Sequence, residues 1–311
     1  MMRYGIDLGG TKIEIAALAP TGEIVLRERT PTPRGDYTST VAAIRDLVTG
    51  AEGKLGVRGT VGVAIPGTIS PKAGLVKNAN STKLIGHPLD KDLSAALGRT
   101  VRLANDANCF ALSEASDGAA AGKPVVFGII AGTGIGGGVV VDGNIITGAH
   151  SIGGEWGHNP LPGARADEIP GPQCYCGKHG CIEAWCSGPF FEAQFEAATG
   201  RRLSAREIAA AAESGDLQAQ SVMEKWLDRF ARSIATLVNI LDPDAIVMGG
   251  GLSNIDVLYR ELPARVEHYA FTPEGPTLIV KNRHGDSSGV RGAAWLWREG
   301  DPEGLPQGTL K

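Results

Sequence analysis

Two segments in different halves of the chain have nearly the same residue pattern, and this similarity constrains the fold more than any other feature. Residues 5–11 (GIDLGGT) align with residues 128–134 (GIIAGTG). In each, an apolar strand-like run turns at glycines and continues into a second β-rich segment, IEIAAL or GGVVV. The alignment predicts two related domains that each present a glycine hairpin to a shared cleft, with a chance match as the alternative.

Strand-like and helix-like segments alternate along the whole chain, which is typical of α/β proteins. The expected strands are residues 3–8, 13–18, 59–67, 101–105, 125–130, 137–141 and 245–250. The expected helices are residues 37–52, 89–98, 107–116, 220–241, a helix from about 255, and 289–297. The apolar stripe of the longest helix indicates core packing, and Asp242-Pro243 is expected to end that helix.

A chain of 311 residues is long enough for two domains of ordinary size. The glycine- and alanine-rich residues 117–124 resemble a crossing between domains. We therefore expect an N-terminal α/β domain over 1–117 and a C-terminal α/β domain over 118–288. A C-terminal helix at about 289–303 is expected to pack back on the first domain.

Composition excludes several classes of function. A formal net charge of −4 and a pI near 5.9 provide no basic surface for nucleic acid. No apolar run approaches the length of a membrane span, and the N-terminal MMRYGIDLGG has no signal-peptide pattern. Five cysteines, three of them clustered, fit a reducing cytoplasm. We expect a cytoplasmic protein without membrane or nucleic-acid partners, in which Cys109 and Cys186 are buried, inert thiols.

Three cysteines and one histidine have the spacing of a structural zinc site. The four residues are His158, Cys174, Cys176 and Cys181. Glu155 and Glu183 flank them, so a metal centre here would bring two carboxylates and a histidine together. Such an arrangement suits a polar substrate, whereas the alternative is a surface knuckle that only fastens a loop.

One glycine loop has the spacing of a dinucleotide fingerprint but lacks its context. Gly132, Gly134 and Gly137 satisfy G-x-G-x-x-G, yet the following GGVVVDG favours a strand rather than the required helix. No Gly-Lys pair has the Walker A context either. The remaining prediction is two hairpins, GGTK and GTG, whose backbone N–H groups could hold phosphates. An ordinary hairpin turn is the alternative for each.

Charged residues beside these hairpins favour the phosphate interpretation. Asp7 precedes the first hairpin, where a carboxylate repels phosphate unless a cation such as Mg²⁺ lies between them, and Lys12 adds a positive charge. The triple glycine at 249–251 permits the close backbone approach that an adenosine group needs, although a close contact within the core is the alternative.

Asp106 follows a strand at the start of a helix, within LANDANC. It could be a helix N-cap, or a general base that takes a proton from a hydroxyl as this attacks phosphorus. Phosphoryl transfer otherwise depends on positioning and electrostatics, which the hairpins and Mg²⁺ would supply.

Together these segments resemble the ROK family of bacterial sugar kinases and repressors. The motifs that carry the resemblance are DLGGTK at 7–12, NDAN at 105–108, GTGIGGG at 132–138, GEWGH at 154–158 and CYCGKHGCIE at 174–183. The resemblance spans essentially the whole chain. It implies a two-domain actin-like ATPase (ribonuclease H-like) α/β fold whose lobes close over ATP and a hexose in a central cleft.

The resemblance also implies roles for individual residues. Asp106 becomes the catalytic base, and the sugar hydroxyls are bound by Asn80, Asn105, Asp106, Glu155, His158 and Glu183. ATP and Mg²⁺ are expected at Asp7, Gly9, Gly10, Thr11, Lys12, Gly132, Thr133, Gly134, Gly249 and Gly250. Structural Zn²⁺ is expected at His158, Cys174, Cys176 and Cys181, and a homodimer is expected.

Function and substrate leave alternatives. The repressors of the family carry an added N-terminal helix-turn-helix, for which a chain starting with RYGIDLGGTK has no room, so we expect a kinase. A chaperone-like ATPase would not explain carboxylates around a metal centre. Residues 65–84, 158–162 and 283–297 most resemble the fructokinase or manno(fructo)kinase branch. We therefore expect phosphorylation of D-fructose to fructose 6-phosphate, with mannose or glucose slower and N-acetylglucosamine kinase as the alternative.

Overall fold

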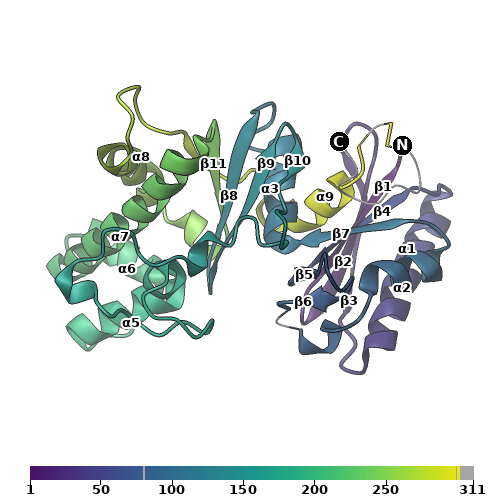
Figure 1. Ribbon diagram of the computed structural model, residues 1–311, viewed down its shortest axis with the longest axis horizontal. Helices are drawn as coiled ribbons and strands as arrows, with labels where there is room; N and C mark the ends of the chain where they lie inside the picture. The colour runs from purple at the N-terminus through teal and green to yellow at the C-terminus, as the bar shows by residue number, and fades with distance from the viewer. Residues whose placement is uncertain (80, 299, 302–311) are drawn as a thin grey trace. The chain divides into compact units, whose positions relative to one another are not determined.

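The described part of the chain contains two five-stranded sheets with the same arrangement (Figure 1). The structure is a computed structural model that describes residues 1–79, 81–298 and 300–301. One sheet has the strand order β3-β2-β1-β4-β7, and the other has the order β10-β9-β8-β11-β12. In each, three consecutive antiparallel strands are extended by two parallel strands. The internal similarity therefore does reflect two related α/β halves.

Each sheet belongs to its own compact unit. Unit 1 consists of Met1–Asp117, Thr147–Gly153 and the described residues from Asp286 onward, and unit 2 consists of Gly118–Ile146 and Gly154–Gly285. The sequence assigns 147–153 and 286–288 to the second domain instead. Residues 147–153 join unit 1 through contacts such as the Lys77 ammonium, which donates a hydrogen bond to the His150 carbonyl (2.6 Å).

The elements of unit 1 follow the alternation expected from the sequence. They are β1 (Arg3–Leu8), β2 (Lys12–Leu18), β3 (Ile24–Pro31), α1 (Tyr37–Leu55), β4 (Thr60–Ile65), β5 (Thr68–Ile69), β6 (Val76–Lys77), the 3-10 turn η1 (Thr82–Leu84), α2 (Leu89–Leu97), β7 (Val101–Asn105), α3 (Asp106–Ser116), η5 (Gly285–Ser287, which begins at the unit boundary) and α9 (Ser288–Trp295). The sequence did not predict the edge strand β3, the short β5–β6 pair or the 3-10 turns.

Unit 2 contains more helix than the sequence predicted. Its elements are β8 (Val125–Ala131), β9 (Ile135–Val141), β10 (Asn144–Ile145), η2 (Trp156–His158), η3 (Ala166–Glu168), α4 (Ile182–Cys186), α5 (Gly188–Thr199), α6 (Ala205–Glu213), α7 (Leu217–Leu241), β11 (Ala245–Gly249), η4 (Gly251–Asn254), α8 (Val257–Tyr269) and β12 (Ile279–Lys281). Helices α4–α6 and strands β10 and β12 were not predicted. The expected stop of α7 is confirmed, because Asp242 caps it in the left-handed conformation.

The two faces of the unit 1 sheet are covered by different helices. Tyr4, Ile6 and Leu8 of β1 point into a core with α1 and α2, whereas Gly5 faces α9. This alternation is the period of two that a strand requires. Helix α9 in turn packs against α3 (Figure 1). The C-terminal helix is thus an integral layer of unit 1, as expected from the sequence, although it ends at Trp295.

Glycines permit the close packing of α9. A Cβ atom on Gly5 would overlap the Val290 carbonyl oxygen, and one on Gly62 of β4 would overlap the Ala293 carbonyl oxygen. On the opposite side of α9, a Cβ on Gly292 would overlap the Cys109 carbonyl of α3. Backbone therefore lies against backbone on both sides of this helix.

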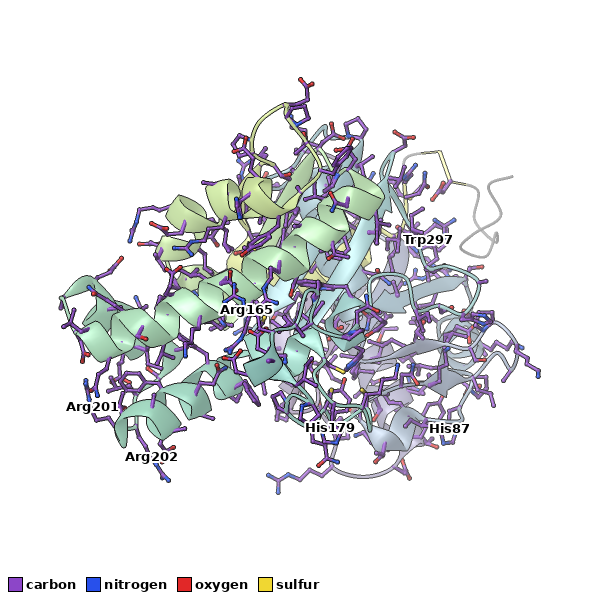
Figure 2. All side chains as sticks on the ribbon, turned by 60° about the vertical axis from the view of Figure 1, so that its left-hand side comes forward. His87, Arg165, His179, Arg201, Arg202 and Trp297 are labelled. Carbon is purple, nitrogen blue, oxygen red and sulfur yellow. The ribbon has the colours of Figure 1, made fainter. Side chains whose placement is uncertain are left out.

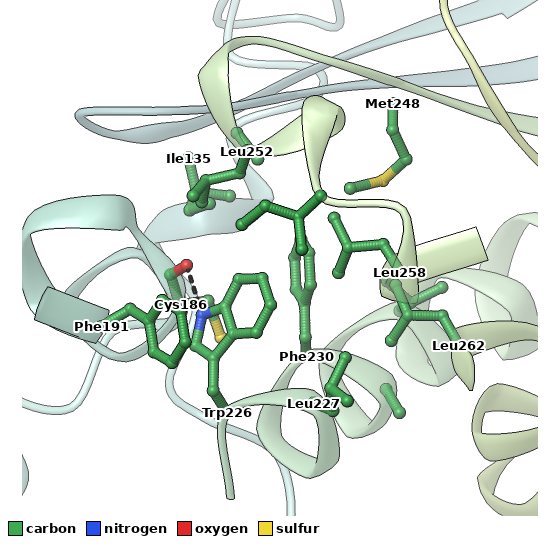
Figure 3. Close-up of a cluster of buried hydrophobic side chains, with 14 of the residues drawn as sticks. Ile135, Cys186, Phe191, Trp226, Leu227, Phe230, Met248, Leu252, Leu258 and Leu262 are labelled. Carbon is green, nitrogen blue, oxygen red and sulfur yellow. Dashed lines mark hydrogen bonds between the residues drawn. The ribbon is translucent and has the colours of Figure 1, made fainter. Parts of the chain in front are cut away.

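The core of unit 2 is built around the apolar stripe of α7 (Figure 3). Trp226 is fully buried, stacks on Phe191 (ring centroids 4.5 Å apart) and donates its indole N–H to the Cys186 carbonyl (2.9 Å). The predicted core role of this stripe is confirmed. Cys186 and Cys109 are both fully buried, as expected, and burial raises the pKa of the Cys186 thiol to about 12.

Several surface arginines of unit 2 form ion pairs within the unit. Arg201 and Arg202, labelled in Figure 2, form ion pairs with Asp216 (2.5 Å) and Glu196 (2.6 Å). Such exposed pairs contribute little to stability, but they leave no arginine cluster here. Among the described residues, no helix is both long and apolar enough to cross a membrane.

We predict that Gly62→Ala destabilises the protein by about 1–3 kcal/mol, because the new methyl group must displace the α9 backbone. The matched control is Gly50→Ala within α1, where a Cβ meets no atom within 4 Å. That change should be neutral or stabilising by about 0.5–1 kcal/mol. Urea denaturation of both variants measures the difference; equal midpoints would contradict the role assigned to Gly62.

Candidate active site

The turn between β1 and β2 exposes backbone amides. Gly9 donates its N–H to the Lys12 carbonyl (3.0 Å), and the buried Thr32, which directly follows β3, anchors the turn. The Thr32 hydroxyl donates to the Gly9 carbonyl (2.7 Å), and its N–H donates to the Thr11 carbonyl (2.9 Å). The amides of Gly10 and Thr11 have no partner among the described residues and lie in exposed positions. Such a turn can bind an anion. The sequence reasoning missed Thr32, which directly follows the unpredicted strand β3.

Asp7 lies behind this turn in a largely enclosed position. Burial, with smaller contributions from the charges of Asp106 and Glu14, raises its pKa to about 6. Gly289, next to the start of α9, lies beside this carboxylate, since a Cβ there would be in van der Waals contact with Asp7 Oδ2 (3.4 Å). The carboxylates of Asp7 and Asp106 therefore repel each other electrostatically. A divalent cation between them would relieve this repulsion.

Asp106 is not the N-cap of α3. Asn105 is the cap, because its side-chain oxygen accepts the Ala107 N–H (2.9 Å), and its amide donates to the Gly67 carbonyl (3.2 Å). Asp106 occupies the first helical position and is exposed. The capping alternative thus belongs to Asn105, and the Asp106 carboxylate is accessible from solvent.

A second turn, Gly132-Thr133-Gly134, joins β8 to β9. Gly132 donates its N–H to the Gly134 carbonyl (2.9 Å), and the Gly188 N–H at the start of α5 donates to the Gly132 carbonyl (2.8 Å). The amides of Thr133 and Gly134 have no partner within the described residues. The two predicted hairpins thus share one property, exposed amides at the turn.

The glycines after β11 lie beside this second turn. Gly249 ends β11 in register with Ile130 of β8. Gly250 has φ +79°, and a Cβ on it would lie against Ala131, whereas Gly251 has no neighbour within 4 Å of its Cβ position. The close-contact alternative therefore accounts for Gly250. Adenosine binding by Gly249 and Gly250 stays a prediction.

The four expected metal ligands gather in one place. The ligand atoms of His158, Cys174, Cys176 and Cys181 all lie within 4.8 Å of one another. Cys176 Sγ and Cys181 Sγ are 3.6 Å apart, as are Cys174 Sγ and His158 Nδ1. Zn–S bonds of about 2.3 Å in a tetrahedron place ligand atoms about 3.8 Å apart. These residues therefore fit a tetrahedral zinc ion, with His158 binding through Nδ1.

The second ring nitrogen of His158 contacts a residue that the sequence reasoning missed. The Tyr175 hydroxyl lies 3.0 Å from His158 Nε2. Burial and the nearby charges of Glu183 and Glu155 raise the pKa of Tyr175 to about 12. The two carboxylates expected to bind sugar therefore lie close to this hydroxyl and to the metal cluster. The only feature of the sequence that could have indicated Tyr175 is its position between Cys174 and Cys176.

A buried ion-pair network holds the loop between His158 and Cys174, two members of the cysteine–histidine cluster. Glu168 accepts hydrogen bonds from Arg229 and Arg232 of α7 at 2.8–2.9 Å. Arg232 also donates to the carbonyls of Pro162 (2.7 Å) and Gly163 (2.8 Å). Burial alone would raise the pKa of Glu168, but the backbone N–H of Arg165 and the side chains of Arg229 and Arg232 hold it below its usual range. Two arginines of α7 thus hold the loop that precedes the cysteine segment. His179 of the cysteine segment is labelled in Figure 2.

The structure places the expected site residues in two groups. Asp7, the first hairpin, Asn105 and Asp106 belong to unit 1. The second hairpin, the 249–250 glycines, Glu155, Glu183 and the metal cluster belong to unit 2. Asn80, expected to bind sugar, lies outside the described residues.

Comparison with known proteins identifies the family of this chain. Residues 3–300 match the ROK family. An N-acetyl-D-glucosamine kinase of Yersinia enterocolitica is 42% identical over 299 residues, covering 95% of this chain and 99% of the relative. The chain belongs to the ROK family.

Solved structures show the same fold. The ROK hexokinase of Thermus thermophilus has a TM-score of 0.83 and 33% identity, over 95% of this chain and 97% of that one. A ROK glucokinase of Streptomyces griseus, solved with glucose and AMPPNP, has a TM-score of 0.75 and 27% identity, over 96% of this chain and 100% of that one. The expected actin-like ATPase fold is confirmed.

We predict that Asp7→Asn stabilises the protein at pH 7–8 by about 1–3 kcal/mol. The folded-state pKa of about 6 exceeds the ordinary 3.8, so wild-type stability is full below pH 4 and falls as the pH rises through 6. Urea denaturation between pH 4 and pH 8 measures both proteins. The gain should disappear near pH 4, and a gain independent of pH would refute the assigned cause.

We predict that Cys176→Ser loses bound zinc and makes residues 159–181 sensitive to protease. The Cys176 side chain is exposed, so its replacement removes a ligand with little loss of packing. Elemental analysis and limited proteolysis measure the two effects. Cys186→Ala, which changes a buried thiol outside the cluster, should retain the metal; equal zinc in both variants would show that Cys176 is not a ligand.

Proposed function

We propose that this ROK-family sugar kinase transfers phosphate from Mg·ATP to a hydroxyl of N-acetyl-D-glucosamine. The observation that supports this choice of substrate is the 42% identity to an N-acetyl-D-glucosamine kinase over 95% of this chain. The similarity covers both groups of site residues. Kinases named for this sugar from Yersinia, Pectobacterium and Salmonella share this level of identity.

The expected preference for fructose has less support. It rested on three short segments, whereas the catalytic motifs are common to both branches of the family. The comparisons favour the alternative that the sequence left open, N-acetylglucosamine. A pocket that binds hydroxyl groups with charged side chains discriminates strongly against a sugar that leaves those side chains unpaired, so a panel of sugars separates the two proposals.

Asp106 is the proposed general base. Its carboxylate is exposed at the first turn of α3, while Asn105 supplies the cap. A base in this position takes the proton of the attacking hydroxyl, which contributes about 10²–10⁴ in rate. Asn105, Glu155, His158 and Glu183 are the proposed sugar-binding groups, and Asn80 is proposed from family resemblance alone.

The two glycine turns are proposed to bind the ATP phosphates. Their outward amides, Gly10 and Thr11 in one turn and Thr133 and Gly134 in the other, suit anionic oxygens. Asp7 is proposed to act through Mg²⁺, whose charge would return the pKa of this carboxyl toward its ordinary range. Lys12, beside Asp7, adds a positive charge on the phosphate side.

Zinc is the metal we propose for the cysteine–histidine cluster. When bound, it would supply no redox chemistry and would fix the loop that bears Glu155, His158 and Glu183. Tyr175 is proposed to hold His158 Nε2 until a sugar hydroxyl replaces it. The protein itself supplies the charged groups that contact substrate.

The decisive measurement is ADP release from Mg·ATP with N-acetylglucosamine, N-acetylmannosamine, glucose, mannose and fructose. We expect the highest kcat/KM with N-acetylglucosamine. Asp106→Asn is the matched control and should lower kcat by about 10²–10⁴ while leaving nucleotide affinity nearly unchanged. Preference for fructose would restore the first expectation. ADP release that no sugar stimulates would refute the kinase proposal.

A further inference from the structure

The Glu183 carboxylate contacts both the metal cluster and the β8–β9 turn. Glu183 lies in the first turn of α4, whose N-cap is the metal ligand Cys181. One carboxylate oxygen, Oε1, lies 3.8 Å from Cys174 Sγ. The other, Oε2, accepts the backbone N–H of Ile135 (2.9 Å). A single side chain thus connects two features that are 48 residues apart in sequence.

The turn is shaped around this carboxylate. A Cβ on Gly134 would lie 2.6 Å from Glu183 Oε2, which is closer than real Cβ atoms approach an oxygen. Glycine at 134 therefore lets the carboxylate reach the next amide in the chain. The Ile135 amide, at the first position of β9, is satisfied by a carboxylate instead of a strand partner at the turn.

Other contacts fix the strand beyond the turn and the first residue of the turn, while Glu183 holds the residue that follows the turn. The Trp156 indole N–H donates to the Gly136 carbonyl (3.1 Å), and the absence of a side chain on Gly157 lets this segment lie against the Ile135 carbonyl. Gly188 holds the Gly132 carbonyl. The Ile135 N–H is the group nearest the outward amides of Thr133 and Gly134, and Glu183 holds it.

We propose that Glu183 is a positioning residue that couples the metal centre to the nucleotide-binding turn, in addition to its proposed contact with sugar. The proposal rests on the proposed function, in which the Thr133 and Gly134 amides bind phosphate. In this proposal the metal ligands fix the start of α4, and α4 positions the Glu183 carboxylate. The carboxylate in turn orders the Thr133 and Gly134 amides before nucleotide binds. Loss of the acceptor or of the metal weakens nucleotide binding even when no sugar is present.

The charge of Glu183 and its hydrogen bond have separable effects. A carboxylate near phosphate is electrostatically unfavourable, so its retention here favours a structural reason. Gln at this position keeps an oxygen that accepts the Ile135 N–H and removes the charge. Ala removes both, and Asp withdraws the carboxylate from the amide by one methylene group.

The test is AMPPNP affinity, measured by calorimetry on the full-length, zinc-loaded protein in the absence of sugar. Glu183→Ala should weaken binding roughly 10-fold, as expected for loss of one hydrogen bond to a charged group, and Glu183→Asp should weaken it in the same direction. Glu183→Gln should stay within about 3-fold of wild type. Chelation of zinc from the wild type should reproduce the effect of Glu183→Ala.

The matched control is Glu155→Ala, since the Glu155 side chain makes no hydrogen bond within the described residues. It should weaken sugar binding only. If Glu183→Ala and Glu183→Asp both bind AMPPNP as the wild type does, the coupling proposal is wrong and Glu183 acts on sugar alone. If the wild type itself binds no AMPPNP, the proposed function fails instead, so the two failures are distinguishable.

Discussion

Parallel pairing of the central strands is the constraint on which the candidate site residues of each unit depend. In unit 1, β1, β4 and β7 run in the same direction, so the chain leaves β1 and β7 at the same edge of the sheet. This edge brings the Asp7 carboxylate within electrostatic reach of Asp106, although 98 residues separate them in the sequence. In unit 2, β8 and β11 are parallel too, and the second hairpin lies beside the glycines that follow β11. Ligand sites at the carboxyl ends of parallel strands are a general property of such sheets.

The sequence predicts those features whose causes are local. The strand–glycine–strand repeat, the apolar stripe of α7 and the spacing of the clustered cysteines each lie within a short window, and each is confirmed as a structural arrangement. Helix α6 could have been predicted in the same way, because Ser204 and Glu207 form a capping box that is visible in the sequence. Strand β3 is harder, since its alternately exposed residues form an edge strand beside β2.

Features that depend on tertiary contacts could not be predicted. The N-cap of α3 is one example: both Asn and Asp cap helices well, and in the structure Asn105 is the cap while its amide also donates to the distant Gly67 carbonyl. The link from Glu183 to Ile135 is another, because the pattern around Glu183 indicates the metal cluster and says nothing about β9. Thr32 likewise acquires its role only when the segment after β3 meets the β1–β2 turn.

The sugar substrate, like the tertiary contacts, could not be predicted from short sequence motifs. Residues that activate a hydroxyl and bind phosphates perform the same task for any sugar, so their motifs cannot separate fructose from N-acetylglucosamine. Discrimination depends on the shape of the pocket wall and on which polar groups are left unpaired by the wrong sugar. The groups proposed to bind sugar in this protein include residues next to the cysteine–histidine cluster, and the buried Glu168–Arg232 pair lies in the same loop. Such a loop can differ between relatives while the catalytic edge of the sheet stays the same, and similarity along the whole chain is therefore a better guide to the sugar than the catalytic motifs.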